Sequence, residues 1–508
     1  MKIVTITMAS ALLMLSAGVL AEVRLASPFA DGMVLQRDRE VSVWGTADAG
    51  EKVRVMFAGN EVTATADEAG AWSVRLPKMA ASKEGRILTA MSEETKIPQT
   101  ISDVLVGEVW YCCGQSNTEL PLVGDNPHFS DRQGRLVAQM TRKPFVRFAY
   151  AADYKFSGEP RKTAPYPIVW QAFTPENLTK GKSFSAMGVY FALELYSALD
   201  IPIGIVGSYW GGTMIDPWTP RTGYENHPEL QDVADWKFIP ESEWNDSCKK
   251  GGFDRAHQQP SCLWNEMVAP WCPMTMRGFI WYQGCSNHRE SERYCAKMHA
   301  LYDGWAKEFE NPDLKLYFVQ LAPYEIPWWG LQLAQAKFAA EEPNAAMVTT
   351  VDVGNLADIH PNEKGTIGKR LAALALRHDY GFEDLVADAP TLRGICSEEG
   401  RLILSFNNAK RWYVYQPDWG VDYGFEIAGP DGEWKKAYLV NVNDGAKEKK
   451  KWQTNGRCEG RDLILAADGV EKPMKVRYLY NRPWFGTVYA DSGLPLGPFE
   501  AEVKSDGR

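Results

Sequence analysis

Four short segments contain residue types that together could carry out acyl transfer. They are Gly114-Gln115-Ser116-Asn117, Gly211-Gly212-Thr213, Gln283-Gly284-Cys285-Ser286-Asn287 and Asp358-Ile359-His360-Pro361. A serine hydroxyl can attack an acyl carbonyl once a base removes its proton, and glycine N–H groups with neutral amides can stabilise the resulting oxyanion. Each segment alone is common in loops, whereas all four in this order indicate acyl transfer.

Ser116 is the predicted nucleophile and His360 the predicted base. Of the seven histidines, His360 is the one that follows a predicted strand with a carboxylate, Asp358, two positions before it. A carboxylate in this place would hold the imidazole tautomer and stabilise the imidazolium after proton transfer. The three residues therefore form the predicted catalytic triad.

The predicted oxyanion hole combines backbone and side-chain donors. Gly212 would supply an N–H group, and the side-chain amide of Asn287 or of Gln283 would supply a second donor. Polar and aromatic side chains in the same segments are predicted to contact the substrate, namely Gln115, Asn117, Trp210, Trp218 and Trp281.

The elements between these segments must bring them together. Short apolar runs predict buried strands at 104–113, 203–207, 278–282, 316–321 and 346–353. Amphipathic stretches predict helices at 186–199, 290–309, 331–342 and 363–377. The alternation predicts an α/β fold, a doubly wound parallel sheet with helices on both faces. Ligands of such sheets bind at the carboxyl ends of the strands, and each of the four segments follows a strand.

The regions on both sides have a different pattern. Alternating residues in 34–76 and again in 401–406 and 475–480 predict short strands with one buried face. We therefore expect an N-terminal β-sandwich-like domain at 22–100, a catalytic domain at 101–386 and a C-terminal β-sandwich-like domain at 387–508.

Residues 1–21 have the pattern of a signal peptide. Lys2 precedes an apolar run from Ile3 to Leu20, and the run ends in Val19-Leu20-Ala21, whose small or short side chains suit signal peptidase. Removal of this segment predicts an exported protein, periplasmic or extracellular, without a membrane span. An uncleaved anchor is the alternative, because the run is just long enough to cross a bilayer.

Composition narrows the class of partner. A formal net charge of -10 argues against binding to nucleic acid or to an anionic membrane. The 19 tryptophans offer flat indole faces that suit sugar rings, although they serve equally well as core residues. The nine cysteines lack C-x-x-C spacing, so we expect no metal site. We expect scattered structural thiols, and the sequence leaves open whether they form one or two disulfides.

The four segments resemble the blocks of the SGNH hydrolase superfamily, with Ser116, Gly212, Asn287 and His360 matching its four name-giving residues. More narrowly, the chain resembles the sialate O-acetylesterase family. The closer match rests on Gly107-Glu108-Val109-Trp110, Trp210-Gly211-Gly212-Thr213 with Trp218, Leu263-Trp264-Asn265, Trp281-Tyr282-Gln283-Gly284, and Asp358-Ile359-His360-Pro361 with Arg370-Leu371-Ala372. Flanking matches include Met33-Val34-Leu35-Gln36, Val43-Trp44-Gly45 and Val476-Arg477-Tyr478. The resemblance covers nearly the whole chain after residue 21.

This resemblance implies a serine esterase that removes acetyl groups from the hydroxyls of a sugar or glycan, through an acetyl-serine and without a cofactor. The chain departs from the family at Cys285, where a glutamate is usual, and at Thr118, where a methionine is usual. Its D-x-H spacing is one residue shorter than the D-x-x-H common in the superfamily, so Asp352 is the alternative to Asp358.

Two other functions remain open. One is an acetylesterase for acetylated xylan or another polysaccharide, with the same triad. The other is a carbohydrate-binding protein without activity, in which Cys285 marks a decayed site. A sialic acid carboxylate would require a cation, for which Arg277 and Arg289 are the candidates.

Overall fold

The computed structural model describes residues 22–94, 96–150, 154–164, 166–178, 184–249, 253–415, 422–443, 455–458, 460–481 and 485–503. The predicted signal peptide, 1–21, lies outside the described residues. Among the helices in these ranges, none is both long and apolar enough to span a membrane. All nine cysteines are free thiols, so the structure contains neither of the disulfides that the sequence left open.

A central sheet runs in the order β10-β9-β11-β8-β12-β13-β14, and every neighbouring pair is parallel except β10 with β9. All five predicted strands are present. The two strands at one edge, β9 and β10, were not predicted from the sequence. The bounds are β8 (Pro98–Gly114), β9 (Lys143–Tyr150), β10 (Trp170–Phe173), β11 (Ile203–Tyr209), β12 (Gly278–Tyr282), β13 (Lys315–Val319) and β14 (Ala345–Val348).

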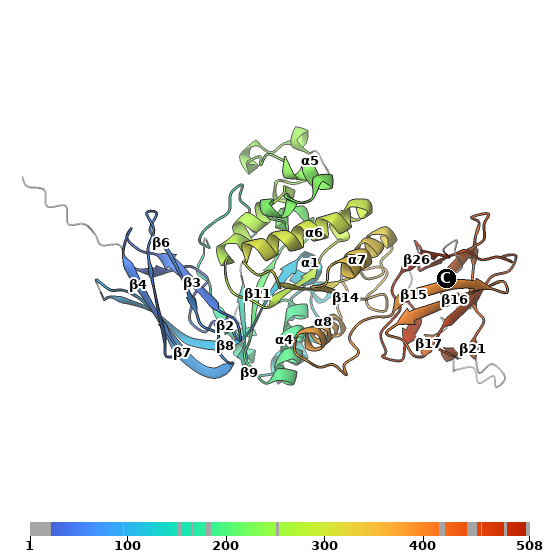
Figure 1. Cartoon of the computed structure of the whole chain (residues 1–508), viewed down its shortest axis with the longest axis horizontal. Helices are drawn as coiled ribbons and strands as arrows, with labels where there is room; N and C mark the ends of the chain where they lie inside the picture. The colour runs from blue at the N-terminus through green and yellow to red at the C-terminus, as the bar shows by residue number, and fades with distance from the viewer. Residues whose placement is uncertain are drawn as a thin grey trace, which may run out of the picture.

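The four predicted long helices are also confirmed, each within two residues of the expected bounds. They are α4 (Ala186–Leu199), α6 (Ser291–Glu308), α7 (Trp329–Glu341) and α8 (Lys364–Asp379). Figure 1 shows α6 and α7 on one side of the sheet and α4 and α8 on the other. Short helices α1 (Ser116–Glu119), α2 (Gly134–Met140), α3 (Pro175–Leu178) and α5 (Gln231–Ala234) lie in the connections.

The topology places β8 in the middle of the sheet. The chain leaves β8, adds β9, β10 and β11 on one side of it, then crosses to add β12, β13 and β14 on the other side. The direction of winding therefore reverses at β8. Crevices for ligands form at such a reversal, because the loops that follow the neighbouring strands diverge there.

The N-terminal strands extend the central sheet. One small sheet has the order β1-β3-β6, while β2, β4, β5 and β7 join the sheet that contains β8. The strand β8 crosses the predicted boundary at 100/101, and one hydrophobic core extends from Val23 to Ala387. The predicted domain bounds stay a prediction. These strands are β1 (Arg24–Leu25), β2 (Val34–Gln36), β3 (Val41–Thr46), β4 (Lys52–Phe57), β5 (Asn60–Thr65), β6 (Ala71–Leu76) and β7 (Ser82–Ser92).

A β-rich region forms the C-terminal end of the molecule, opposite the N-terminal strands (Figure 1). It has a second hydrophobic core, which includes Leu402, Trp412 and Val476. The chain thus has an α/β fold with a C-terminal β-rich region. The described strands are β15 (Thr391–Glu398), β16 (Arg401–Asn407), β17 (Trp412–Tyr415), β18 (Phe425–Ala428), β19 (Trp434–Lys436), β20 (Tyr438–Leu439), β21 (Val442–Asn443), β22 (Asn455–Cys458), β23 (Leu463–Ala466), β24 (Lys475–Tyr478), β25 (Val488–Ala490) and β26 (Phe499–Glu502).

Candidate active site

Ser116 lies where β8 turns into α1. The turn passes through Gly114, whose φ is +143° and where a Cβ atom would come within 2.4 Å of the Tyr282 carbonyl oxygen. Only glycine fits this close approach. Ser116 is half-buried and is the first residue of α1. Because it is at the helix start, its backbone N–H has no acceptor within the helix. Negative charge is favoured at this end of a helix.

His360 reaches Ser116 in a connection that begins at an edge strand of the sheet. Its Nε2 lies 2.9 Å from Ser116 Oγ, within hydrogen-bond distance for proton transfer to the ring. The histidine belongs to the connection 349–363, which follows the edge strand β14 and returns past β13 and β12 to the middle strand β8. The structure therefore joins the first and the last of the four predicted segments.

Asp358 is the carboxylate beside the histidine. Its Oδ1 accepts a hydrogen bond from the His360 backbone N–H at 2.9 Å and lies 3.5 Å from His360 Nδ1. Asp352, the alternative, is held elsewhere by a two-bond pair with Arg370, at 2.8 and 2.6 Å. The geometry therefore favours Asp358 as the residue that orients the ring.

The surroundings of His360 favour its neutral form. Burial lowers the pKa of His360 below its ordinary value of 6.5, and the nearby charge of Lys364 lowers it further, while Asp358 opposes both effects. The ring also packs edge-on against Phe129, with centroids 5.0 Å apart. A neutral imidazole is the form that can accept the serine proton.

A buried cluster of Asn117, Cys285 and Lys364 lies behind the catalytic pair, and we call it the inner cluster. Lys364 is fully buried, and its Nζ donates to Asn117 Oδ1 at 2.6 Å, while Asn117 Nδ2 donates to the Ile359 carbonyl at 3.0 Å. Asn117 thus ties the helix that begins at Ser116 to the residue before His360. Among the described residues, no carboxylate forms an ion pair with Lys364.

Cys285 stands near this ammonium, at the position where the resemblance led us to expect a glutamate. Burial raises the pKa of the Cys285 thiol to about 12, so the thiol stays neutral and does not replace the missing carboxylate. Burial lowers the pKa of Lys364 to about 7. Lys364 was not predicted from the sequence, because a lysine at a helix start is normally exposed and nothing in the spacing indicates its burial.

The backbone donors beside Ser116 come from the turn after β11. Gly212 has a φ of +73°, is exposed, and has open space where a Cβ atom would lie. The N–H of its neighbour Gly211 donates to Glu119 Oε2 at 2.7 Å, which holds the turn against α1. The Gly212 N–H has no acceptor among the described residues, so it is available to donate a hydrogen bond to a ligand.

The side-chain amides of Gln283 and Asn287 differ in how many of their hydrogens are free to form a further hydrogen bond. Gln283 uses both hydrogens of its amide, in bonds to the Thr213 carbonyl at 3.0 Å and to Asn287 Oδ1 at 2.7 Å. Asn287 donates one bond, to Glu290 Oε2 at 2.6 Å, which leaves one amide hydrogen unassigned. Both side chains are buried. Only Asn287 could therefore donate to an oxyanion without breaking a bond.

Most of the residues predicted to contact substrate are in the core instead, which corrects that expectation. Trp218 and Trp281 are both 0 % exposed and pack edge-on against each other. Gln115 is buried and accepts a bond from the Gly284 N–H at 3.0 Å, and Asn117 is buried in the inner cluster. These polar residues position the loops. Trp210 is half-buried, and its ring is stacked on that of His257 at 4.5 Å.

The structure also distinguishes the two arginines that were candidates to bind a sialic acid carboxylate. Arg277 lies before β12, at the amino end of the strand, and is paired with the buried Glu108 at 3.1 Å. It is therefore excluded as a substrate contact. Arg289 is exposed, follows Asn287 at the carboxyl end of the sheet, and has no ion-pair partner among the described residues.

Comparisons with known proteins agree with the motifs. Residues 241–377 match the family described as carbohydrate esterase, sialic acid-specific acetylesterase. The chain is 29% identical to sialate O-acetylesterase of Homo sapiens over 405 residues, covering 72% of this chain and 73% of that protein. It is 27% identical to sialate O-acetylesterase of Rattus norvegicus, covering 72% and 75%.

A solved structure extends the likeness to the flanking regions. The crystal structure of a carbohydrate acetylesterase from Xanthomonas citri superposes with a TM-score of 0.77 and 28% identity. The match covers 95% of this chain and 100% of the other.

Proposed function

We propose that this chain, a relative of the sialate O-acetylesterases, is a serine esterase that removes acetyl groups from sugar hydroxyls. The observation that supports this most directly is the 2.9 Å contact between Ser116 Oγ and His360 Nε2. It joins residues 244 positions apart at the carboxyl end of the sheet, where an α/β fold binds its ligands. We also propose that the fold is of the SGNH type and that the protein is exported.

In the first half of the reaction, His360 Nε2 takes the proton of Ser116 as Oγ attacks the acetyl carbonyl. The oxyanion receives hydrogen bonds from the N–H groups of Ser116 and Gly212, with Asn287 as the third donor. Loss of one such donor typically costs about 3 kcal/mol of transition-state stabilisation. Asp358 holds the ring and stabilises the imidazolium. The C–O bond to the sugar then breaks, and His360 returns the proton to the sugar oxygen.

In the second half, water replaces the sugar. His360 takes a proton from this water as the water oxygen attacks acetyl-Ser116. The tetrahedral adduct forms in the same oxyanion hole and collapses to acetate, and the proton returns to Ser116 Oγ. The residues that act in both halves are therefore the same.

The nucleophile is tested with Ser116→Ala. We expect the release of acetate from an aryl acetate and from acetylated glycans to fall by several orders of magnitude, because no other hydroxyl replaces the nucleophile. Ser397→Ala, an exposed serine in β15, is the matched control and should retain the activity. Equal rates for wild type and Ser116→Ala would instead favour the carbohydrate-binding protein.

The orienting carboxylate is tested with Asp358→Asn. We expect kcat to fall by about 10⁴-fold with the fold intact, as in a serine protease whose orienting aspartate was replaced. Asp352→Asn is the control, because it breaks the pair with Arg370 and should lower Tm without a comparable loss of kcat. Near-normal kcat for Asp358→Asn would assign the role to another residue.

The glycan is tested through Arg289. A sialic acid carboxylate suits its exposed guanidinium, whereas neutral acetyl-xylan does not require a cation. Arg289→Ala should raise KM for 9-O-acetylated sialic acid by about tenfold and leave acetyl-xylan unaffected. A preference of the wild type for acetyl-xylan, with no effect of Arg289→Ala on either substrate, would establish the polysaccharide esterase instead.

A further inference from the structure

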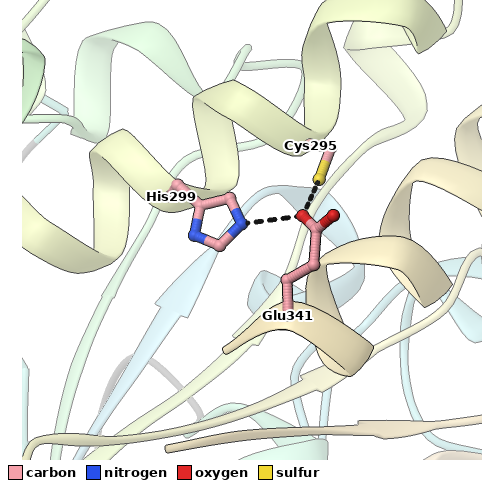
Figure 2. A group of neighbouring side chains, drawn as sticks. All are labelled: Cys295, His299 and Glu341. Atoms are coloured by element: carbon pink, nitrogen blue, oxygen red, sulfur yellow. Dashed lines mark hydrogen bonds and ion pairs between the residues drawn. The ribbon is translucent and has the colours of Figure 1, made fainter. Parts of the chain in front are cut away.

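Cys295, His299 and Glu341 form a second cluster with cysteine, which we call the outer cluster (Figure 2). Cys295 and His299 are four residues apart on α6, so they lie on the same face of the helix. Glu341 is the last residue of the neighbouring helix α7. Figure 2 shows the Cys295 thiol and the His299 ring both directed at one carboxylate oxygen of Glu341.

Two of the three distances within the outer cluster, both hydrogen bonds in this structure, also fit a metal site. Glu341 Oε2 lies 3.4 Å from Cys295 Sγ and 3.2 Å from His299 Nε2, and all three ligand atoms lie within 4.8 Å of one another. Zinc bonds of about 2.3 Å to sulfur and about 2.0–2.1 Å to nitrogen and oxygen give tetrahedron edges of about 3.5 Å and about 3.3 Å. The two measured edges are close to these values.

The surroundings leave the site accessible. Cys295 is buried, whereas the His299 and Glu341 side chains are 23% and 46% exposed, so an ion and a water molecule can enter from solvent. The cation nearest to the carboxylate is Lys337, whose Nζ is 3.8 Å from Oε1 and not from the oxygen that faces the other ligands. The Lys337 side chain is 65% exposed and free to move away.

We propose that Cys295, His299 and Glu341 bind a borderline-soft divalent metal, Zn²⁺ in the first place, with water as the fourth ligand. A thiolate and an imidazole favour zinc over calcium or magnesium, which prefer oxygen ligands. On binding, the thiol proton passes to solvent as the metal–sulfur bond forms. The site is independent of the proposed esterase activity.

A metal at this site would join two helices that support the same strand end. Tyr294 of α6 donates to Gln283 Oε1 at 2.8 Å, and Gln335 of α7 donates to the Gln283 carbonyl at 3.3 Å. A metal between α6 and α7 would therefore stabilise both supports of this loop. We did not expect this site from the sequence, because the third ligand comes from a different helix.

The test uses the full chain after removal of metals with a chelator, titrated with Zn²⁺ alone by calorimetry and with Co²⁺ by absorption. We expect one equivalent of Zn²⁺ to bind and raise Tm, and the Co²⁺ complex to show a thiolate charge-transfer band. Cys295→Ser should abolish the band, and Cys295→Ser and His299→Asn should each weaken Zn²⁺ binding by at least about tenfold.

Two variants serve as matched controls. Cys248→Ser removes a partly exposed thiol, and His378→Asn removes a surface histidine that is paired with Asp388 at 3.0 Å. Both should bind Zn²⁺ as the wild type does. No Zn²⁺ binding by the wild type, or equal binding by the wild type and the Cys295→Ser, His299→Asn double variant, would overturn the proposal. Since acetate release is not a readout, failure of the esterase proposal leaves this result unchanged.

Discussion

Cys285 and Cys295 lie close together in the sequence but in opposite electrostatic surroundings. Burial raises the thiol pKa of both to about 12. Beside Cys285 stands the ammonium of Lys364, which opposes this effect, and beside Cys295 stands the carboxylate of Glu341, which adds to it. Among the described residues, Lys364 of the inner cluster has no carboxylate in an ion pair, whereas the outer cluster contains a carboxylate, an imidazole and a thiol.

This difference shows how the neighbours of a thiol determine what it can do. In the inner cluster, the charge belongs to Lys364 when its amine is protonated. Lys364 donates to Asn117, which in turn donates to the Ile359 carbonyl in the His360 loop. In the outer cluster, the thiol, imidazole and carboxylate atoms lie close together, and two of the three side chains are partly exposed. This arrangement suits a cation that binds from solvent. We therefore expect changes in the inner cluster to affect catalysis and changes in the outer cluster to affect metal binding.

Among changes in the two clusters, the largest effect is expected for Lys364→Met. It leaves the buried Asn117 Oδ1 without its donor, which costs about 1–3 kcal/mol and loosens the contact to the His360 loop. We expect kcat on an aryl acetate to fall by roughly tenfold to a hundredfold, with a smaller change in KM. Lys369→Met, an exposed lysine on the same helix, should have no such effect. An unchanged kcat would show that the inner cluster does not position His360.

A smaller effect is expected for Cys285→Glu, which gives Lys364 a carboxylate partner. The pKa of Lys364, now about 7, should rise, so the ammonium persists at higher pH. Since hydrogen bonds from charged donors are about twice as strong as neutral ones, kcat of the wild type should decline severalfold above pH 7, and the variant should resist this decline. Cys285→Ser is the control. Parallel pH profiles for all three proteins would contradict the predicted pairing.

The pH profile of the wild type should reflect the same cation. The base must be neutral, so kcat/KM falls as the pH falls through the pKa of His360. Because burial and Lys364 lower this pKa, the acid limb should have its midpoint below 6.5. In Lys364→Met, the midpoint should move to higher pH, because one of the two lowering effects is gone. Measurements of kcat/KM across the acid range give the midpoint of the acid limb for the wild type and for Lys364→Met. A wild-type midpoint above 6.5 would contradict the lowered pKa of His360.

The smallest effect is expected for Cys295→Ser measured without added metal. The outer cluster touches neither Ser116 nor His360, so kcat/KM should stay within about twofold of the wild type. The comparison between the clusters is sharpest if this variant loses Zn²⁺ binding but not activity, and Lys364→Met loses activity but not Zn²⁺ binding. A large loss of kcat/KM in Cys295→Ser would remove the distinction.

Much of the fold could be predicted from local patterns. The five predicted strands and four predicted helices are present, because apolar runs and helical periodicity are local properties of the sequence. The resemblance to the sialate O-acetylesterase family is confirmed. The edge strands β9 and β10 were missed, since their residues are less uniformly apolar and half-buried positions interrupt the pattern.

The sequence by itself determined the residue types available for the chemistry and their order along the chain, which was enough to predict Ser116, His360 and Asp358. Only the tertiary structure decided that Trp218 and Trp281 are core residues, that Gln283 has no free amide hydrogen, and that Lys364 is buried. The physical reason is that burial and hydrogen-bond partners depend on segments far apart in the sequence. Glu341 likewise meets Cys295 and His299 only because α6 and α7 pack side by side.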